Sequence, residues 1–197
     1  MIAGVARELA PEAEQSSKEL GKAPPRLARR LGGVPLACAL AVVVFAPCLR
    51  YGFAMDDFAL LEAGQAPLAA GIPAHFVPRA GVHYRPVGQY GFFWAADRLL
   101  PFHPLAYHLA NLALHLLNVV LVGRLLQRFV ADRVATGLAT IFFATHAAFF
   151  LVLAWVALAG EALPLLFMLA ALGCQVNFLA ARSGRRVGWW LGALLFV

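Results

Sequence analysis

Residues 105–122 read LAYHLANLALHLLNVVLV, a run of 18 positions without Asp, Glu, Lys or Arg. A helix of that length extends about 27 Å, close to the roughly 30 Å hydrocarbon layer of a bilayer. Runs that are equally free of charge occupy about 31–49, 134–152 and 162–181, and a shorter one fills 189–197. The sequence therefore predicts an all-α, polytopic membrane helix bundle with about four full transmembrane helices and a partial fifth.

The composition agrees with a lipid environment. The chain of 197 residues is 62% hydrophobic and only 13% charged, whereas soluble domains average about 45–50% apolar and about 25% charged residues. The net charge of +6 comes mostly from arginines in short clusters between the apolar runs. A nucleic-acid-binding protein would instead gather them on one soluble face. We therefore expect membrane lipid as a partner, and no nucleic acid.

The placement of charge predicts how the chain crosses the membrane. Basic clusters lie at 26–30, 124–133 and 182–186, between alternate apolar runs. Five of the six acids that follow the first 30 residues lie in the other connections: Asp56, Asp57, Glu62, Asp97 and Glu161. Positive charge is retained in the cytoplasm. This pattern predicts a multi-pass inner-membrane (plasma-membrane) protein whose N-terminus is cytoplasmic and whose outer loop is 50–104.

Three further segments have their own expected structures. The polar tail 1–30 lacks a sustained apolar face and is predicted to be disordered and cytoplasmic. In the outer loop, the aromatic segment Tyr90–Trp94 is too short to cross and predicts a helix in the membrane interface. The sequence stops inside the apolar run 189–197, so we expect it to be the N-terminal part of a longer protein.

Two pairs in the outer loop could carry chemistry. Asp56 and Asp57 are adjacent, so their carboxylates point in different directions, and one could act as a general base while the other orients the substrate or binds a divalent cation. The alternative is a solvated turn. Tyr84 and Arg85 could bind a phosphate near the membrane surface. The alternative for Arg85 is pairing with lipid headgroups or with Asp97.

A polar stripe follows the second apolar run. His108, Asn111, His115 and Asn118 are spaced by three, four and three residues and so share one helical face. Such groups either bond a neighbouring helix or line a substrate cavity. Zinc is not expected, because the two histidines are two turns apart without a third ligand nearby in sequence. His146, near the outer end of the third run, and Glu161, before the fourth, are further candidates.

These motifs, in this order, resemble GT-C superfamily glycosyltransferases. The similar parts are Asp56-Asp57-Phe58, Tyr84-Arg85-Pro86, Phe102-His103-Pro104 and the run from His108 to Asn118, with His146 and Glu161 near that family's third-span His and following acid. The likeness is to membrane mannosyltransferase-like proteins, which often carry tetratricopeptide repeats. The chain departs from their pattern at Ala147, at Phe149–Leu151 and at Ala159.

The resemblance implies transfer of a sugar from a polyprenyl-phosphate carrier to a protein or glycan acceptor on the non-cytoplasmic face. It implies that Asp56 or Asp57 is the catalytic base and that basic residues hold the lipid phosphate. The alternatives are a non-catalytic membrane scaffold and a transporter. A transporter is expected to show broken helices or repeated halves, and the sequence gives no sign of either.

Overall fold

The computed structural model describes residues 33–65, 86–181 and 188–192, and these residues form helices with no strand among them. The all-α prediction is therefore confirmed for this part of the chain. The predicted tail 1–30, Tyr84, Arg85 and most of the partial fifth span lie outside the described residues.

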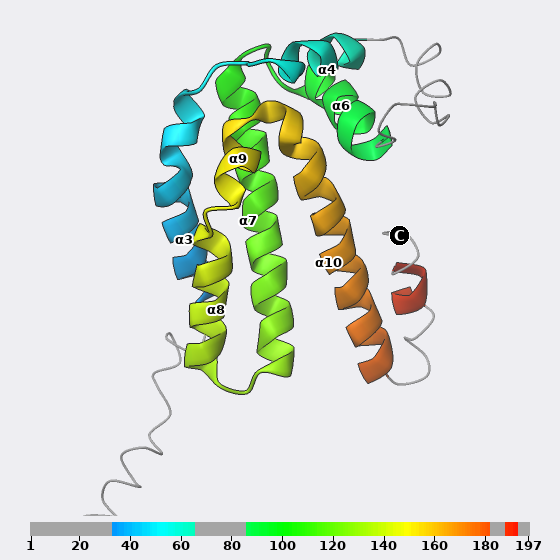
Figure 1. Cartoon of the computed structure of the whole chain (residues 1–197). Coiled ribbons are helices and arrows are strands. Elements are labelled where there is room, and N and C mark those ends of the chain that lie inside the picture. The colour runs from blue at the N-terminus through cyan, green and yellow to red at the C-terminus, as the bar shows by residue number, and fades with distance from the viewer. Residues whose placement is uncertain (1–32, 66–85, 182–187, 193–197) are drawn as a thin grey trace, which may run out of the picture. The chain divides into compact units, whose positions relative to one another are not determined.

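Among the described residues, two helices are long and apolar enough to cross a membrane. They are α7 (Pro104–Phe129) and α10 (Ala159–Ala180), which is preceded directly by the 3₁₀ turn η3 (Val156–Leu158). The first apolar run forms the shorter helix α3 (Val34–Phe45), continued by the 3₁₀ turn η1 (Ala46–Arg50). In Figure 1, α3, α7, α8 (Arg133–Thr145) and α10 lie alongside one another.

The second predicted span ends later than expected. We predicted an end at Val122, but α7 continues seven residues further to Phe129. Arg124, Gln127 and Arg128 are exposed on these last turns, and both residue types favour helices. A charged residue therefore ended the apolar run without ending the helix.

The third predicted span, 134–152, is not one helix. α8 ends at Thr145, and a separate short helix, α9 (Phe149–Ala154), follows. His146 has an extended backbone, and its Nδ1 accepts a hydrogen bond of 3.2 Å from the backbone N–H of Ala148. This local bond satisfies the N–H of Ala148, the residue directly before α9, where the chain turns away from α8. The prediction of an unbroken helix was wrong.

Small residues let the helices approach closely. A Cβ added to Gly33 would lie 2.4 Å from the Cα of Gly137 on α8, and one added to Gly123 on α7 would lie 2.4 Å from Val34 Cγ2. Close approach at glycine is a common way for membrane helices to associate when burial of apolar surface gives no advantage. It brings α3 against both α7 and α8, while α10 packs against α7.

The described residues of the outer segment, 50–65 and 86–104, include the short helices α4 (Asp56–Gly64) and α6 (Phe92–Leu99), the latter preceded by the π-helical turn η2 (Pro86–Gly91). They lie together near the start of α7 (Figure 1). One apolar cluster joins them to the rest: Leu61, Phe93, Ala96, Tyr107 and Val156. The helix expected around Tyr90–Trp94 is thus present from Phe92 onward.

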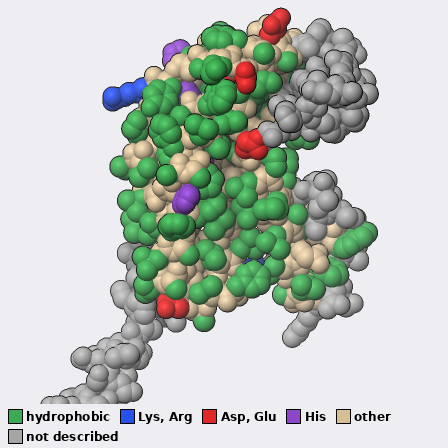
Figure 2. Space-filling view, viewed as in Figure 1, with side chains coloured by type: hydrophobic (Ala, Val, Ile, Leu, Met, Phe, Trp, Pro, Cys, Tyr) green, Lys and Arg blue, Asp and Glu red, His purple; other side chains and the backbone are tan. Residues whose placement is uncertain are grey.

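Apolar side chains cover the surface of the long helices. Figure 2 shows hydrophobic residues across the visible face, with most acidic side chains near the end where α4 and α6 lie. Large exposed apolar side chains include Val43, Leu138, Phe142, Met168 and Leu179. An apolar surface of this extent is unusual for a soluble monomer and fits contact with lipid.

Candidate functional site

The two adjacent aspartates have different surroundings. Asp57 is fully buried, and both of its carboxylate oxygens accept backbone hydrogen bonds. Oδ2 accepts from the N–H of Ala54 at 2.8 Å, and Oδ1 accepts from the N–H of Ala157 at 2.6 Å. Ala157 belongs to η3, directly before α10. Asp57 therefore fastens the start of α4 to the start of a long apolar helix.

Asp56, in contrast, is exposed. The two side chains do point in different directions, as adjacent residues on a helix must. Asp56 begins α4 in its first turn, where the backbone N–H groups favour a negative charge. Of the two carboxylates, only that of Asp56 can meet a substrate hydroxyl without first giving up its backbone bonds.

The residue before the pair is held in a strained conformation. Met55 has φ 47° and ψ −113°, a region that side chains with a Cβ rarely adopt. Its side chain is 79% exposed, so burial of that side chain does not explain the strain. Strain of this kind costs of order 1–3 kcal/mol and persists only where the surroundings impose it.

A second long-range bond imposes that conformation. The indole Nε1 of Trp155 donates to the carbonyl of Ala54 at 3.3 Å. Together with the bond from Ala157 to Asp57, it ties residues 54–57 to residues 155–157 at two points. The acidic segment is thus held in a fixed position at one end of α7 and α10.

Burial raises the pKa of the Asp57 carboxyl above its ordinary value of 3.8. The N–H groups of Ala54 and Ala157 and the charge of His108 act in the opposite direction, while Asp56 adds to the rise. His108, buried on α7, is therefore electrostatically coupled to Asp57. The structure brings these two predicted residues together.

The polar stripe of α7 bonds the carbonyls of other helices. His115 Nε2 contacts the Ala144 carbonyl at 2.9 Å, near the end of α8, and Asn118 Nδ2 donates to the Ala162 carbonyl at 3.1 Å. Asn111 Nδ2 and His108 Nδ1 contact the carbonyls of Val152 and Leu153, at 3.3 and 3.0 Å, at the end of α9.

This arrangement explains how the break in the third apolar run is tolerated. Carbonyls near a helix end lack partners in the next turn, and lipid cannot supply them. Three of the stripe residues satisfy carbonyls near the ends of α8 and α9. Of the two roles that we considered for the stripe, the contacts favour bonds between helices over a substrate cavity.

Some buried polar atoms of the stripe have no hydrogen-bond partner among the described residues. They are His108 Nε2, Asn111 Oδ1 and Asn118 Oδ1. Both amide oxygens are acceptors, and since a carbonyl only accepts, His108 Nδ1 is the donor to Leu153. A buried acceptor without a partner is costly, and a water molecule or a ligand hydroxyl can satisfy it.

The remaining predicted residues differ in how far the structure places them. His146 is exposed, accepts a hydrogen bond from the Ala148 N–H through its ring nitrogen and packs against Phe142. Glu161 is exposed in the first turn of α10. Among the described residues, no group of three or more His, Cys, Asp or Glu side chains is arranged to hold a metal ion. A divalent cation therefore stays a prediction.

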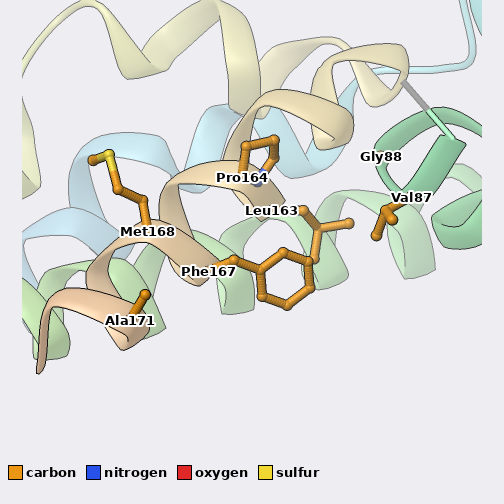
Figure 3. Close-up of a pocket in the computed structure, with 7 residues that line it drawn as sticks. All are labelled: Val87, Gly88, Leu163, Pro164, Phe167, Met168 and Ala171. Carbon is orange, nitrogen blue, oxygen red and sulfur yellow. The ribbon is translucent and has the colours of Figure 1, made fainter. Parts of the chain in front are cut away.

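An apolar pocket of about 380 Å³ lies between η2 and α10. In Figure 3, Leu163 and Phe167 of α10 lie across from Val87 of η2. Gly88 and Gly160 meet backbone to backbone beside it, because a Cβ on Gly88 would lie 2.8 Å from the Gly160 carbonyl. The pocket begins six residues after Ala157, which holds Asp57.

Comparisons with protein-family models, with curated proteins and with solved structures give no match for this chain. Sequence reasoning missed three parts of the site: the Ala157 N–H, the Trp155 indole as a donor to Ala54, and the strained Met55. Trp155 could have been suspected, since a tryptophan next to a polar loop usually finds a partner for its N–H.

Proposed function

We propose that the chain is a membrane glycosyltransferase, or the N-terminal portion of one, that takes a sugar from a polyprenyl-phosphate carrier. The observation that carries the proposal is the division of the acid pair. Asp57 is bound to the start of α10 at 2.6 Å, and this contact holds the exposed Asp56 at one end of the long apolar helices. An enzyme that uses a donor anchored in the membrane needs its reactive side chain at this end of the helices, near the membrane surface.

The reaction would use Asp56 as a general base. The hydroxyl oxygen of a protein or glycan acceptor attacks the anomeric carbon of the sugar as the bond from that carbon to the phosphate oxygen breaks. Asp56 takes the hydroxyl proton, and polyprenyl phosphate leaves. Arg85, with Tyr84, would bind the phosphate and stabilise its charge as it departs. The pocket between η2 and α10 offers an apolar surface for the first isoprene units.

The charge pattern supports an orientation. Arg124 and Arg128 lie near the end of α7, whereas Asp56, Asp57 and Glu161 lie at or near the end where α7 begins. By the positive-inside rule, we infer that the arginine end is cytoplasmic and the acidic end faces the other side of the inner membrane. The four-span topology with a cytoplasmic N-terminus follows if α3 and the broken α8–α9 segment also cross.

A non-catalytic scaffold is the second candidate. The observation in its favour is that Asp57 and the stripe of α7 use their polar atoms in bonds within the protein. A transporter has one supporting feature that we did not predict, the break between α8 and α9. The carbonyls nearest that break, however, are bonded by α7 rather than open to a transported ion.

Reconstitution tests the proposal. Proteoliposomes would contain the chain, or any longer product of its reading frame, with polyprenyl-phosphate-linked sugars of several kinds and peptide or glycan acceptors. We expect release of polyprenyl phosphate that depends on the protein and on an acceptor. If donor lipids bind without turnover, the scaffold is favoured. Uptake of a solute into the vesicles without transfer would favour transport.

A further inference from the structure

A second pocket lies between α7 and α10 at the end opposite Asp56. Its volume is about 280 Å³. Three leucines line its apolar part and three polar side chains its other part: Leu121, Leu125 and Leu169, then Arg124, Arg128 and Asn177. The pocket thus joins an apolar wall, on two helices able to cross a membrane, to a positively charged rim.

The two arginines share one face of α7. They are four residues apart and exposed, and α7 ends one residue after Arg128. Arg128 also donates to Asn177 Oδ1, which holds its side chain across the gap to α10. Their positive charge is thus concentrated at the pocket.

No carboxylate among the described residues forms a salt bridge with either arginine. The nearest acid in sequence, Asp132, already accepts from the N–H groups of Val134 and Ala135 as the cap of α8. The positive charge of the rim is therefore available to an anion.

We propose that this pocket binds an anionic phospholipid. Its phosphate would contact Arg124 and Arg128, and the part of an acyl chain nearest the headgroup would lie along the leucines. Guanidinium groups hold phosphate oxygens through paired hydrogen bonds, and basic pockets between membrane helices suit anionic headgroups. The inference requires that α7 and α10 span the membrane. It does not require sugar transfer, so it can fail or hold independently of the proposed function.

Native mass spectrometry of the purified protein tests the charge requirement. The protein would be loaded with phosphatidylglycerol or, for comparison, phosphatidylcholine. We expect phosphatidylglycerol to be retained, and the double variant R124Q/R128Q to bind it about 30-fold more weakly at an unchanged melting temperature. The control is R50Q, an exposed arginine at the end of η1. Equal retention of both lipids, or equal loss in R50Q, would overturn the proposal.

A second variant tests the apolar wall. Gly173 lines the pocket, and a Cβ added there meets nothing within 4 Å. Gly173→Leu should therefore fill the pocket without straining the helix and lower phosphatidylglycerol retention. Gly52→Leu is the matched control, because Gly52 also has open space around it. Unchanged retention in Gly173→Leu, or full displacement of the lipid by inorganic phosphate, would show that no acyl chain is bound there.

Discussion

The carboxylate of Asp57 and the backbone N–H of Ala157 lie 2.6 Å apart, although one hundred residues of chain separate them. The contact joins the first turn of α4 to the turn that starts α10. Because Asp57 is fully buried, its charge is stabilised by these backbone donors rather than by water. Asp57 therefore positions the segment, and Asp56 is left exposed.

Removal of the Asp57 carboxylate should weaken the protein more than removal of its neighbour. Asp57→Ala leaves the N–H groups of Ala54 and Ala157 buried without acceptors, which should cost about 2–4 kcal/mol of unfolding free energy. Asp56→Ala, which is exposed, is the matched control and should cost less than about 0.5 kcal/mol. Unfolding in mixed micelles with rising dodecyl sulfate measures both. Equal losses would contradict the anchoring role.

The stability should also depend on pH through Asp57. Its pKa in the folded chain is raised above 3.8 by burial. The stabilisation that comes from protonation of Asp57 is therefore fully present below pH 3.8 and is lost as the pH rises through the raised pKa, while the bonds from Ala54 and Ala157 remain. The melting temperature of the native protein should therefore fall as the pH rises from about 3 to about 7, and Asp57→Asn should remove the part of this fall that is due to Asp57. Parallel curves for the variant and the native protein would contradict it.

The bond from His115 to α8 should contribute to stability inside the bundle. His115→Phe keeps an aromatic ring against Phe149, 4.5 Å away between centroids, but removes the bond to the Ala144 carbonyl. We expect a loss of about 1 kcal/mol, measured in mixed micelles. Leu117→Phe, on the exposed side of the same helix, is the control and should change little. If His115→Phe leaves the unfolding free energy unchanged, the bond does not stabilise the broken segment.

The contact between α3 and α8 gives a pair of glycine substitutions with opposite outcomes. A Cβ on Gly33 would lie 2.4 Å from Gly137 Cα, so Gly33→Ala must push the backbones apart. A Cβ on Gly137 would lie 3.6 Å from Gly33 Cα, an ordinary contact. Gly33→Ala should lower the melting temperature, and Gly137→Ala should not. If both variants melt alike, the helices do not approach as described.

Met55 allows the strain next to the acid pair to be measured. Met55→Gly and Met55→Ala remove the same exposed side chain, but only glycine adopts φ 47° without strain. Met55→Gly should therefore be more stable than Met55→Ala by about 1 kcal/mol. The difference is read from unfolding in mixed micelles. If the alanine variant is equally stable, the backbone at this position is not strained.

The two long helices could be predicted because uncharged runs of 18 or more residues leave few alternatives. The break at His146 could not be predicted, since the run 134–152 has no proline and its glycine, Gly137, lies nine residues before His146. Its cause is the bond of the His146 ring to Ala148, together with carbonyl partners on α7. The sequence placed these polar side chains on one face but did not show which carbonyls they bond.

The acid pair was predicted as a unit, and its division into a buried and an exposed member follows from a distant contact. The sequence does not distinguish Asp56 from Asp57, because both partners of Asp57 are backbone N–H groups, those of Ala54 and of the distant Ala157. Backbone donors leave no mark in a sequence. The same holds for Met55, whose conformation depends on bonds made by the residues on either side of it.

Sugar transfer by the Asp56→Asn variant tests the central claim most directly. The assay would follow release of polyprenyl phosphate in proteoliposomes, with Glu62→Gln, another acid of α4, as the control. The account predicts that Asp56→Asn keeps the native melting temperature and loses turnover by about 100-fold or more, as expected for a general base, while Glu62→Gln stays active. Native turnover in Asp56→Asn would contradict the role of this carboxylate.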